Sequence, residues 1–192
     1  KKPLTSPISL EQLKSVLTEM EGTITQVPPM YSAVKVKGKR LYEYAFEGKT
    51  IDRPARKVTI YAIELLTNHD VTECNRSFSI RVTCSKGTYI RTLGVDIGKK
   101  LGYPAHVSQL IRTQSGPFTI EDTVTFQDIE SALQKDQLNE MLYPIEYALT
   151  HFEKQIVADH ELAKKIENGA VIPQFKQMKN QRYRMYNAEG EL

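Results

Sequence analysis

A regular alternation of side chains, followed at once by a glycine turn, constrains this chain more than any other feature of its sequence. From residue 77 to residue 84, apolar side chains occupy every second position and polar side chains lie between them. This period of two predicts a half-buried β-strand, with residues 56–66, rich in β-branched side chains, as its antiparallel neighbour. Residues 85–87 (Ser-Lys-Gly) then predict a tight turn that leads into a helix over residues 89–101. This succession indicates helices packed on a sheet.

The remaining elements follow from helix caps and short extended runs. Ser9 and Gln12 form a capping box before a helix that ends near Met20. Further predicted helices are 41–47, 126–133, 138–149 with a break at Pro144, and 159–167, and further predicted strands are 23–27, 31–37, 106–113 and 182–186. The pattern predicts an α+β fold with a mixed, largely antiparallel sheet and packed helices. We place a boundary near Thr150, so that residues 1–150 form the main domain and residues 151–192 begin a small, truncated, β-rich module.

The two ends of the sequence lead us to expect a piece of a longer protein. The chain opens without Met, and the predicted strand 182–186 is followed by a turn at 187–190 with no return strand. A strand without a neighbour leaves its backbone donors and acceptors unpaired. Either this strand pairs with a distant strand or the chain is an excised part, and we expect the second.

Length and composition place the chain among globular proteins. It has 192 residues, of which 40% are hydrophobic and 26% charged, enough for a buried core. No apolar run reaches the roughly 18 residues that a membrane-spanning helix needs. Cys74 and Cys84 are the two cysteines and cannot build a disulfide framework, so we expect a cytoplasmic protein that does not contact a membrane.

Basic residues gather in two parts of the chain. Between residues 33 and 57, eight basic residues face three acidic ones, and between residues 86 and 112, five face one. Several tyrosines are interleaved with them, which is typical of a surface that binds a polyanion and stacks bases. A solvated face with ordinary core tyrosines remains the alternative.

Metal and phosphate-loop chemistry find no support in the sequence. The four histidines show no ligand spacing, the two cysteines form no C-x-x-C pair, and no G-x-x-x-x-G-K or G-x-G-x-x-G motif occurs. We therefore expect no metal and no cofactor.

Two segments carry the strongest functional signals. Residues 26–42 hold two consecutive prolines and then a strand and turn that bear basic residues, although an edge hairpin with solubilising lysines is the alternative. Residues 84–93 run from the buried strand through the turn into a helix. Arg91 lies in the first turn of that helix, where a cation opposes the helix dipole, so a carboxylate or phosphate partner explains it better than helix stability. A surface arginine on a fraying turn is the alternative.

Both segments, together with residues 105–113 and 115–118, resemble the bacterial tRNA pseudouridine synthase B family, which makes the pseudouridine of the tRNA T-loop at position 55. The resemblance extends over nearly all of residues 9–150 in order, and more weakly the tail over residues 155–192 resembles the start of the family's PUA-like RNA-binding module. It implies a partial pseudouridine synthase core, a tRNA T-arm stem-loop as partner, and a monomer for the full-length protein. It implies that Arg91 pairs with a catalytic aspartate, that Tyr89 and Leu110 line the uracil pocket, and that RNA is bound by Lys35, Lys37, Lys39, Arg40 and Lys86.

One part of the family pattern is absent from the printed sequence. The family's aspartate lies in a G-x-L-D-P-x-A-x-G segment, which does not occur among these residues. Asp96 is flanked by glycines but corresponds to a position on the helix after Arg91. The resemblance therefore implies an RNA-modifying isomerase whose isolated chain is inactive and whose Arg91 is left without its partner. A non-catalytic RNA-binding module on the same scaffold stays open, and a protein-interaction domain unrelated to RNA would require both long motifs to be chance.

Overall fold

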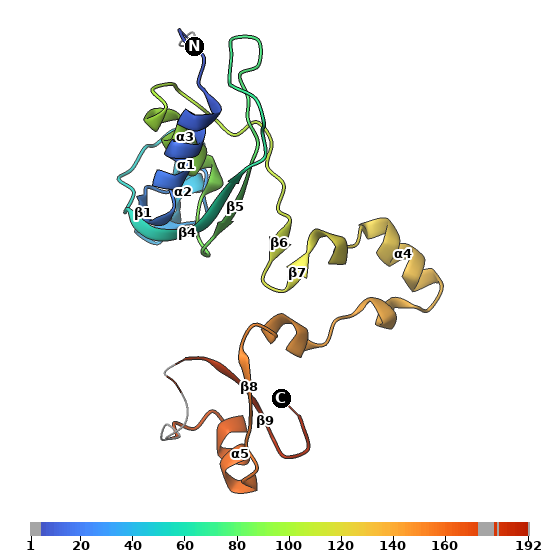
Figure 1. The fold of residues 1–192 in the computed structure, drawn as a ribbon. Coiled ribbons are helices and arrows are strands. Elements are labelled where there is room, and N and C mark those ends of the chain that lie inside the picture. Colours follow the sequence, from blue (N-terminus) through green and yellow to red (C-terminus); the bar gives the residue numbers. More distant parts are fainter. Residues whose placement is uncertain (1–4, 173–178, 180, 192) are drawn as a thin grey trace. The chain divides into compact units, whose positions relative to one another are not determined.

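The computed structural model describes residues 5–172, 179 and 181–191, and the chain divides into two compact units (Figure 1). The first unit is Lys1–Leu110 and the second is Ile111–Leu192. This division lies between Leu110 and Ile111, and the domain boundary near Thr150 stays a prediction.

A three-stranded antiparallel sheet forms the centre of the first unit. Its strands are β1 (Gly22–Gln26), β4 (Arg56–Leu65) and β5 (Ile80–Cys84), in the order β1-β4-β5. Strand β5 shows the alternation that the sequence predicts, because every second residue of it is half-buried and those between are exposed. The predicted hairpin-like pairing of β4 with β5 is confirmed.

Two helices pack against this sheet (Figure 1). Helix α1 (Leu10–Glu19) begins at the predicted capping box, in which Ser9 Oγ accepts from the Gln12 amide at 3.2 Å. Helix α3 (Ile90–Lys100) follows the turn after β5, as predicted. Their apolar faces meet strand β4 in one core, whose fully buried members are Leu17, Met20, Ile60, Leu93 and Ile97. The core thereby fixes α3 relative to the sheet.

A small hairpin and a short helix follow β1. The hairpin joins β2 (Lys35–Val36) to β3 (Lys39–Arg40), and helix α2 (Leu41–Phe46) begins directly after it. The predicted strand over residues 31–37 is wrong except at Lys35 and Val36. Because α2 starts at Leu41, the amides of Leu41 and Tyr42 bond to the carbonyls of Val34 and Ser32 at 2.9 and 3.1 Å, and no strand is left to pair there.

The predicted strand over residues 106–113 does not form. Residues 103–107 lie against helix α3 instead, where glycines let the two backbones approach: a Cβ on Gly98 would lie 2.4 Å from Ala105 Cβ, and one on Gly94 would lie 2.9 Å from Val107. Residues 108–113 are exposed. An alternating sequence therefore packs on a helix here rather than in a sheet.

The second unit opens with short elements. Strands β6 (Gln114–Ser115) and β7 (Phe118–Thr119) form a hairpin, followed by the 3₁₀ helix η1 (Ile120–Asp122). Helix α4 (Phe126–Gln134) begins at the predicted cap Thr125. The predicted helix over residues 138–149 consists of two 3₁₀ helices, η2 (Leu138–Met141) and η3 (Ile145–Leu149), separated at Pro144.

A strand–helix–strand unit ends the described chain. Strand β8 (Glu153–Ile156) lies parallel to β9 (Tyr183–Tyr186), and helix α5 (His160–Glu167), capped by Asp159 as predicted, lies between them in sequence. The expectation that the last strand lacks a neighbour is therefore wrong. Its partner lies thirty residues earlier in the sequence, so no local hairpin signal reveals the pairing.

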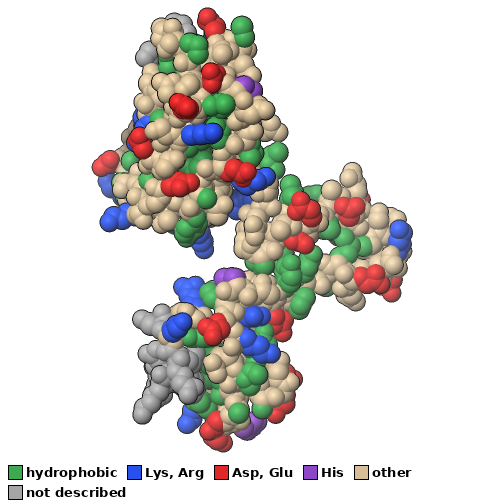
Figure 2. All heavy atoms as spheres, in the orientation of Figure 1, with side chains coloured by type: hydrophobic (Ala, Val, Ile, Leu, Met, Phe, Trp, Pro, Cys, Tyr) green, Lys and Arg blue, Asp and Glu red, His purple; other side chains and the backbone are tan. Residues whose placement is uncertain are grey.

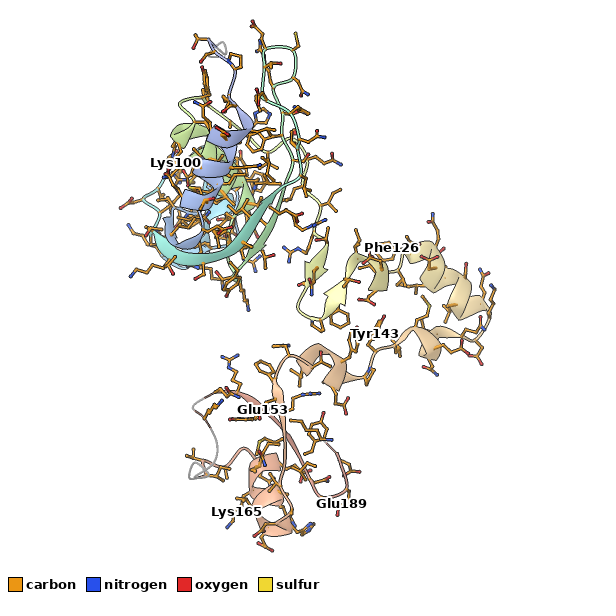
Figure 3. All side chains as sticks on the ribbon, in the orientation of Figure 1. Lys100, Phe126, Tyr143, Glu153, Lys165 and Glu189 are labelled. Atoms are coloured by element: carbon orange, nitrogen blue, oxygen red, sulfur yellow. The ribbon has the colours of Figure 1, made fainter. Side chains whose placement is uncertain are left out.

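The α+β prediction with largely antiparallel pairing is confirmed. Hydrophobic side chains also reach the surface of the second unit (Figure 2), and Phe126 at the start of α4 is 86% exposed (Figure 3). In the ranges that the structure describes, no helix has both the length and the apolar character needed to cross a membrane.

Candidate functional site

The predicted arginine lies where strand β5 passes into helix α3. The turn that joins them is closed by the Thr88 hydroxyl, which donates to the Ser85 carbonyl at 2.8 Å, and Tyr89 is the helix N-cap. Arg91 is therefore in the first turn of α3, and its side chain is exposed. Its Nη2 donates to the carbonyl of Tyr31 at 2.8 Å. This bond joins the helix to the segment that leads into the β2–β3 hairpin.

Arg91 forms no ion pair with any carboxylate of the described residues. Asp96, on the same helix, pairs with Lys99 at 2.9 Å. The guanidinium of Arg91 is held by a backbone carbonyl, and the expectation that its carboxylate partner lies outside this chain stays a prediction.

The β2–β3 hairpin presents its basic side chains in two different ways. Lys37 and Gly38 form its turn with φ of 51° and 82°, a conformation that matches the twist of a two-residue hairpin. Lys35, Lys37 and Arg40 are exposed. Lys39 instead pairs with Glu47 after helix α2, and this hydrogen bond raises the pKa of Lys39 and lowers the pKa of Glu47. Three of the four predicted hairpin cations are thus exposed, while the fourth has an internal partner.

Aromatic rings lie beside this hairpin. Phe46 is 77% exposed and Tyr31 57% exposed, and their rings meet edge to face with centroids 6.0 Å apart. Tyr42 contacts Phe46 at the same separation, and Arg40 donates to the Tyr42 hydroxyl at 3.1 Å. Exposed rings next to cations offer both stacking and phosphate contacts to a nucleic acid.

The other predicted site residues differ in how far their side chains are exposed. The Tyr89 side chain is half-buried, and Lys86 is exposed in the turn that precedes the helix. Leu110 is 59% exposed and ends the first unit. The roles that we assign to these three residues remain predictions.

Sequence reasoning missed Gln26, whose side chain holds the backbone of Tyr89. It is 2% exposed, accepts from the Tyr89 amide at 3.0 Å and donates to the Tyr89 carbonyl at 3.3 Å. One signal could have indicated it: the helix expected after residue 88 has a tyrosine where a capping side chain is usual, so its cap must come from elsewhere.

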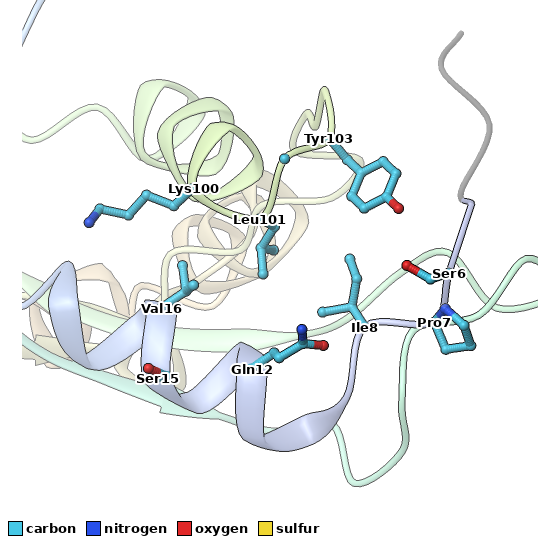
Figure 4. A pocket seen from close by; sticks show the side chains of 10 residues that line it. Ser6, Pro7, Ile8, Gln12, Ser15, Val16, Lys100, Leu101 and Tyr103 are labelled. Atoms are coloured by element: carbon cyan, nitrogen blue, oxygen red, sulfur yellow. The ribbon is translucent and has the colours of Figure 1, made fainter.

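A pocket of the first unit lies at the opposite end of α3 (Figure 4). It has a volume of about 400 Å³ and is lined by residues of the segment before α1, of α1 itself and of 100–103. Hydrogen bonds with Thr5 and Ser6 lower the pKa of Tyr103 there to about 8. Since Arg91 is in the first turn of α3 and this pocket adjoins the last, the pocket is separate from the predicted site. Among the described residues, no three His, Cys, Asp or Glu side chains converge to hold a metal ion.

Comparison with known proteins assigns both units to one family. The family model of the TruB family pseudouridylate synthase N-terminal domain matches residues 1–90, and that of the tRNA pseudouridylate synthase B C-terminal domain matches residues 91–150. The tRNA pseudouridine synthase B of Bacillus licheniformis is 55% identical over 172 residues, which are 90% of this chain and 55% of that protein. The protein of the same name from Halalkalibacterium halodurans is 47% identical over 191 residues, 100% of this chain and 62% of that protein.

Solved structures give the same result for the fold. The crystal structure of a Cbf5-Nop10-Gar1 complex contains a chain that matches with a TM-score of 0.70 and 28% identity, over 98% of this chain and 55% of that chain. The present chain spans little more than half the length of the curated relatives that it matches. Adjoining family matches over residues 1–150, and identity near one half along almost the entire chain, show that the chain belongs to the TruB family of pseudouridylate synthases.

Proposed function

We propose that this chain is part of a tRNA pseudouridine synthase that isomerises the T-loop uridine at position 55 to pseudouridine. Family membership and the names of the curated relatives support this proposal. The observation that carries it is the bond from Arg91 to the Tyr31 carbonyl, because it ties the first turn of α3 to the segment that leads into the basic hairpin. Arg91, the cation proposed for the reaction, is thus joined to the segment that leads into the hairpin proposed to bind the RNA.

The reaction assigns a definite task to Arg91. The bond between ribose C1′ and uracil N1 breaks, the base turns, and a bond forms from C1′ to C5. C5 then loses its proton and N1 is protonated, so that the product is an isomer of the substrate, and an aspartate acts as nucleophile or as the base that starts elimination. Arg91 would pair with this carboxylate, lower the pKa of its carboxyl group and so keep it ionised. A guanidinium has five N–H donors, so the single bond to Tyr31 leaves donors for a bidentate carboxylate.

The RNA must deliver an unstacked base to this carboxylate. Extruding a nucleotide costs stacking energy that a fitted pocket has to compensate. We assign the wall of that pocket to Tyr89 and Leu110. The T-arm phosphates would be bound by the predicted cations Lys35, Lys37, Lys39, Arg40 and Lys86.

The printed chain alone should bind RNA without converting it. Its sequence contains no G-x-L-D-P-x-A-x-G segment, and Arg91 pairs with no carboxylate of the described residues. The complete enzyme would work in the cytoplasm as a monomer, on the tRNA T-arm, without a metal or organic cofactor.

A conversion assay tests this proposal. A T-arm stem-loop with unmodified uridine is incubated with the printed chain, with a longer protein that carries the aspartate segment, and with the longer protein bearing Arg91→Ala. We expect pseudouridine only from the longer protein, and a loss of roughly 100-fold in rate on removal of the arginine, as for other charge-stabilising groups in active sites. Conversion by the printed chain would show that the aspartate is not missing from it.

The alternative is a non-catalytic RNA-binding module on the same scaffold. Arg91 forms no ion pair with any described carboxylate. This observation is expected for a non-catalytic module and equally for an enzyme whose aspartate lies outside the printed chain. A coding sequence without the aspartate segment upstream, together with T-arm binding but no conversion, would establish this alternative.

A further inference from the structure

Gln26 is a buried polar side chain with an unusual pair of partners. It ends strand β1, is 2% exposed, and directs both ends of its carboxamide to the backbone of one residue, Tyr89, which is 63 positions away in the sequence. The Tyr89 amide donates to Oε1 at 3.0 Å, and Nε2 donates to the Tyr89 carbonyl at 3.3 Å. Burying an amide side chain is costly unless it is hydrogen-bonded, so this pairing specifies one position for the Tyr89 backbone.

Helix α3 needs such a partner because its own sequence does not supply one. In a capping box, the third residue of the helix returns a Glu or Gln side chain to the N-cap amide. In α3 the N-cap is Tyr89 and the third helical residue is Thr92, whose side chain is too short for that task. Gln26, which lies on strand β1, instead accepts the hydrogen bond that the N-cap amide donates. The start of the helix is therefore held from the sheet.

Residues 26–31, which begin with Gln26, are bound to α3 at a second point. Five residues after Gln26, the carbonyl of Tyr31 accepts from Arg91 at 2.8 Å. Between them, the Pro28 carbonyl accepts from Arg53 at 3.1 Å. Residues 26–31 are thus attached at both ends to the first turn of α3, through the backbone of Tyr89 and the side chain of Arg91. A shift of Tyr89 relative to β1 would move Arg91 away from its carbonyl partner.

We infer that Gln26 is a positioning residue: its carboxamide holds the N-cap of α3 on strand β1 and thereby fixes where Arg91 lies relative to the segment that carries the RNA-binding hairpin. This inference rests on the proposed function, because that function is what gives the position of Arg91 its importance. It assigns to Gln26 no contact with substrate.

Three variants of the printed chain test the inference. Gln26→Met keeps the length and burial of the side chain and removes both hydrogen bonds. Thr25→Met places the same side chain at the exposed neighbouring position of β1 and is the matched control. The double variant Gln26→Met/Thr92→Gln restores a local capping side chain without the link to the sheet. For each, amide hydrogen exchange at Tyr89, the Arg91 side-chain Nε–H resonance and the affinity for a T-arm stem-loop are measured by NMR and titration.

We expect Gln26→Met to speed Tyr89 exchange and to weaken RNA binding, each by about tenfold, the effect of losing a net hydrogen bond or two. We expect the double variant to recover slow exchange at Tyr89 but to keep the displaced Arg91 resonance and the weaker binding. Full recovery of the Arg91 resonance and of binding in the double variant would show that Gln26 is only a helix cap. An unchanged Arg91 resonance in Gln26→Met would also overturn the inference. If the unsubstituted chain binds no RNA, the proposed function fails, and the Arg91 resonance still decides whether Gln26 positions the arginine.

Discussion

At the residue scale, the arrangement of cations decides what the first unit offers to a polyanion. Arg91 lies in the first turn of α3, where the helix dipole disfavours a positive charge, and a carbonyl of a neighbouring segment holds it there. Lys37 and Lys39 are two residues apart in the hairpin but differ in state, since Lys37 is exposed and Lys39 pairs with Glu47. A lysine already paired within the protein releases fewer counterions on binding RNA than an exposed one.

This difference predicts unequal effects of two otherwise equivalent substitutions. Four of the predicted RNA contacts are cations without an acidic partner among the described residues: Lys35, Lys37, Arg40 and Lys86. A plot of the logarithm of the T-arm binding constant against the logarithm of the salt concentration should therefore have a slope of roughly −3. Lys37→Ala should reduce its magnitude by about one, because one phosphate contact is lost. Lys39→Ala should change the slope by clearly less, since it removes a cation that Glu47 already neutralises. Titrations at several salt concentrations measure both slopes, and equal reductions would contradict the assignment.

At the element scale, helices are held in place by caps and by glycines. The residues 103–107 approach α3 closely at Gly94 and Gly98. The capping box of α4 joins Thr125 to Asp128, whose carboxylate accepts from the Thr125 amide at 2.8 Å and from its hydroxyl at 2.6 Å. The effect of each feature on stability can be measured directly.

Gly98→Ala should destabilise the first unit. The added Cβ would lie 2.4 Å from Ala105 Cβ and 2.7 Å from the Tyr103 carbonyl, and backbone on that side cannot yield without moving the segment. Overpacking of this kind costs about 1–3 kcal/mol. Urea unfolding followed by the signals of the first unit measures it, with the exposed Lys99→Ala on the same helix as control. Equal stability of the two variants would show that residues 103–107 do not pack on this face.

Helix α4 should lose stability in acid through Asp128. Hydrogen bonds from the Thr125 hydroxyl and amide lower the pKa of its carboxyl group in the folded state. This stabilisation is therefore fully present above the unfolded value of about 4 and is lost as the pH falls through the lower pKa of the folded state. Amide chemical shifts of α4 between pH 6 and pH 2 follow the loss. Asp128→Asn, which does not titrate, should abolish this pH dependence, and an unchanged titration in that variant would assign it to another group.

Local signals in the sequence predict helix starts better than they predict strands. The caps Ser9, Thr125 and Asp159 each bond within three residues of themselves, so the sequence window contains the whole interaction. The strand expected at residues 106–113 fails because its outcome depends on glycines in α3. The parallel pairing of β8 with β9 and the buried Gln26 depend on distant partners in the same way, and no local pattern contains them.

At the scale of the whole molecule, the chain consists of two compact units and spans little more than half the length of its curated relatives. The family follows from residues 1–150, and the resemblance of segments 26–42 and 84–93 already predicts it. What those segments do not reveal is how they are joined. The structure joins them through Arg91 and Tyr31 at one point and through Tyr89 and Gln26 at another.

The most direct test of the account is the affinity of the printed chain for a T-arm stem-loop as a function of salt, beside a hairpin of scrambled sequence and the Arg91→Ala variant. We predict binding that prefers the T-arm and weakens steeply with salt, because the exposed cations Lys35, Lys37, Arg40 and Lys86 would contact phosphates. We predict weaker binding in the variant, because Arg91 holds the segment that leads into the hairpin. Absence of binding, or binding insensitive to salt, would contradict the claim that these segments form an RNA-binding surface.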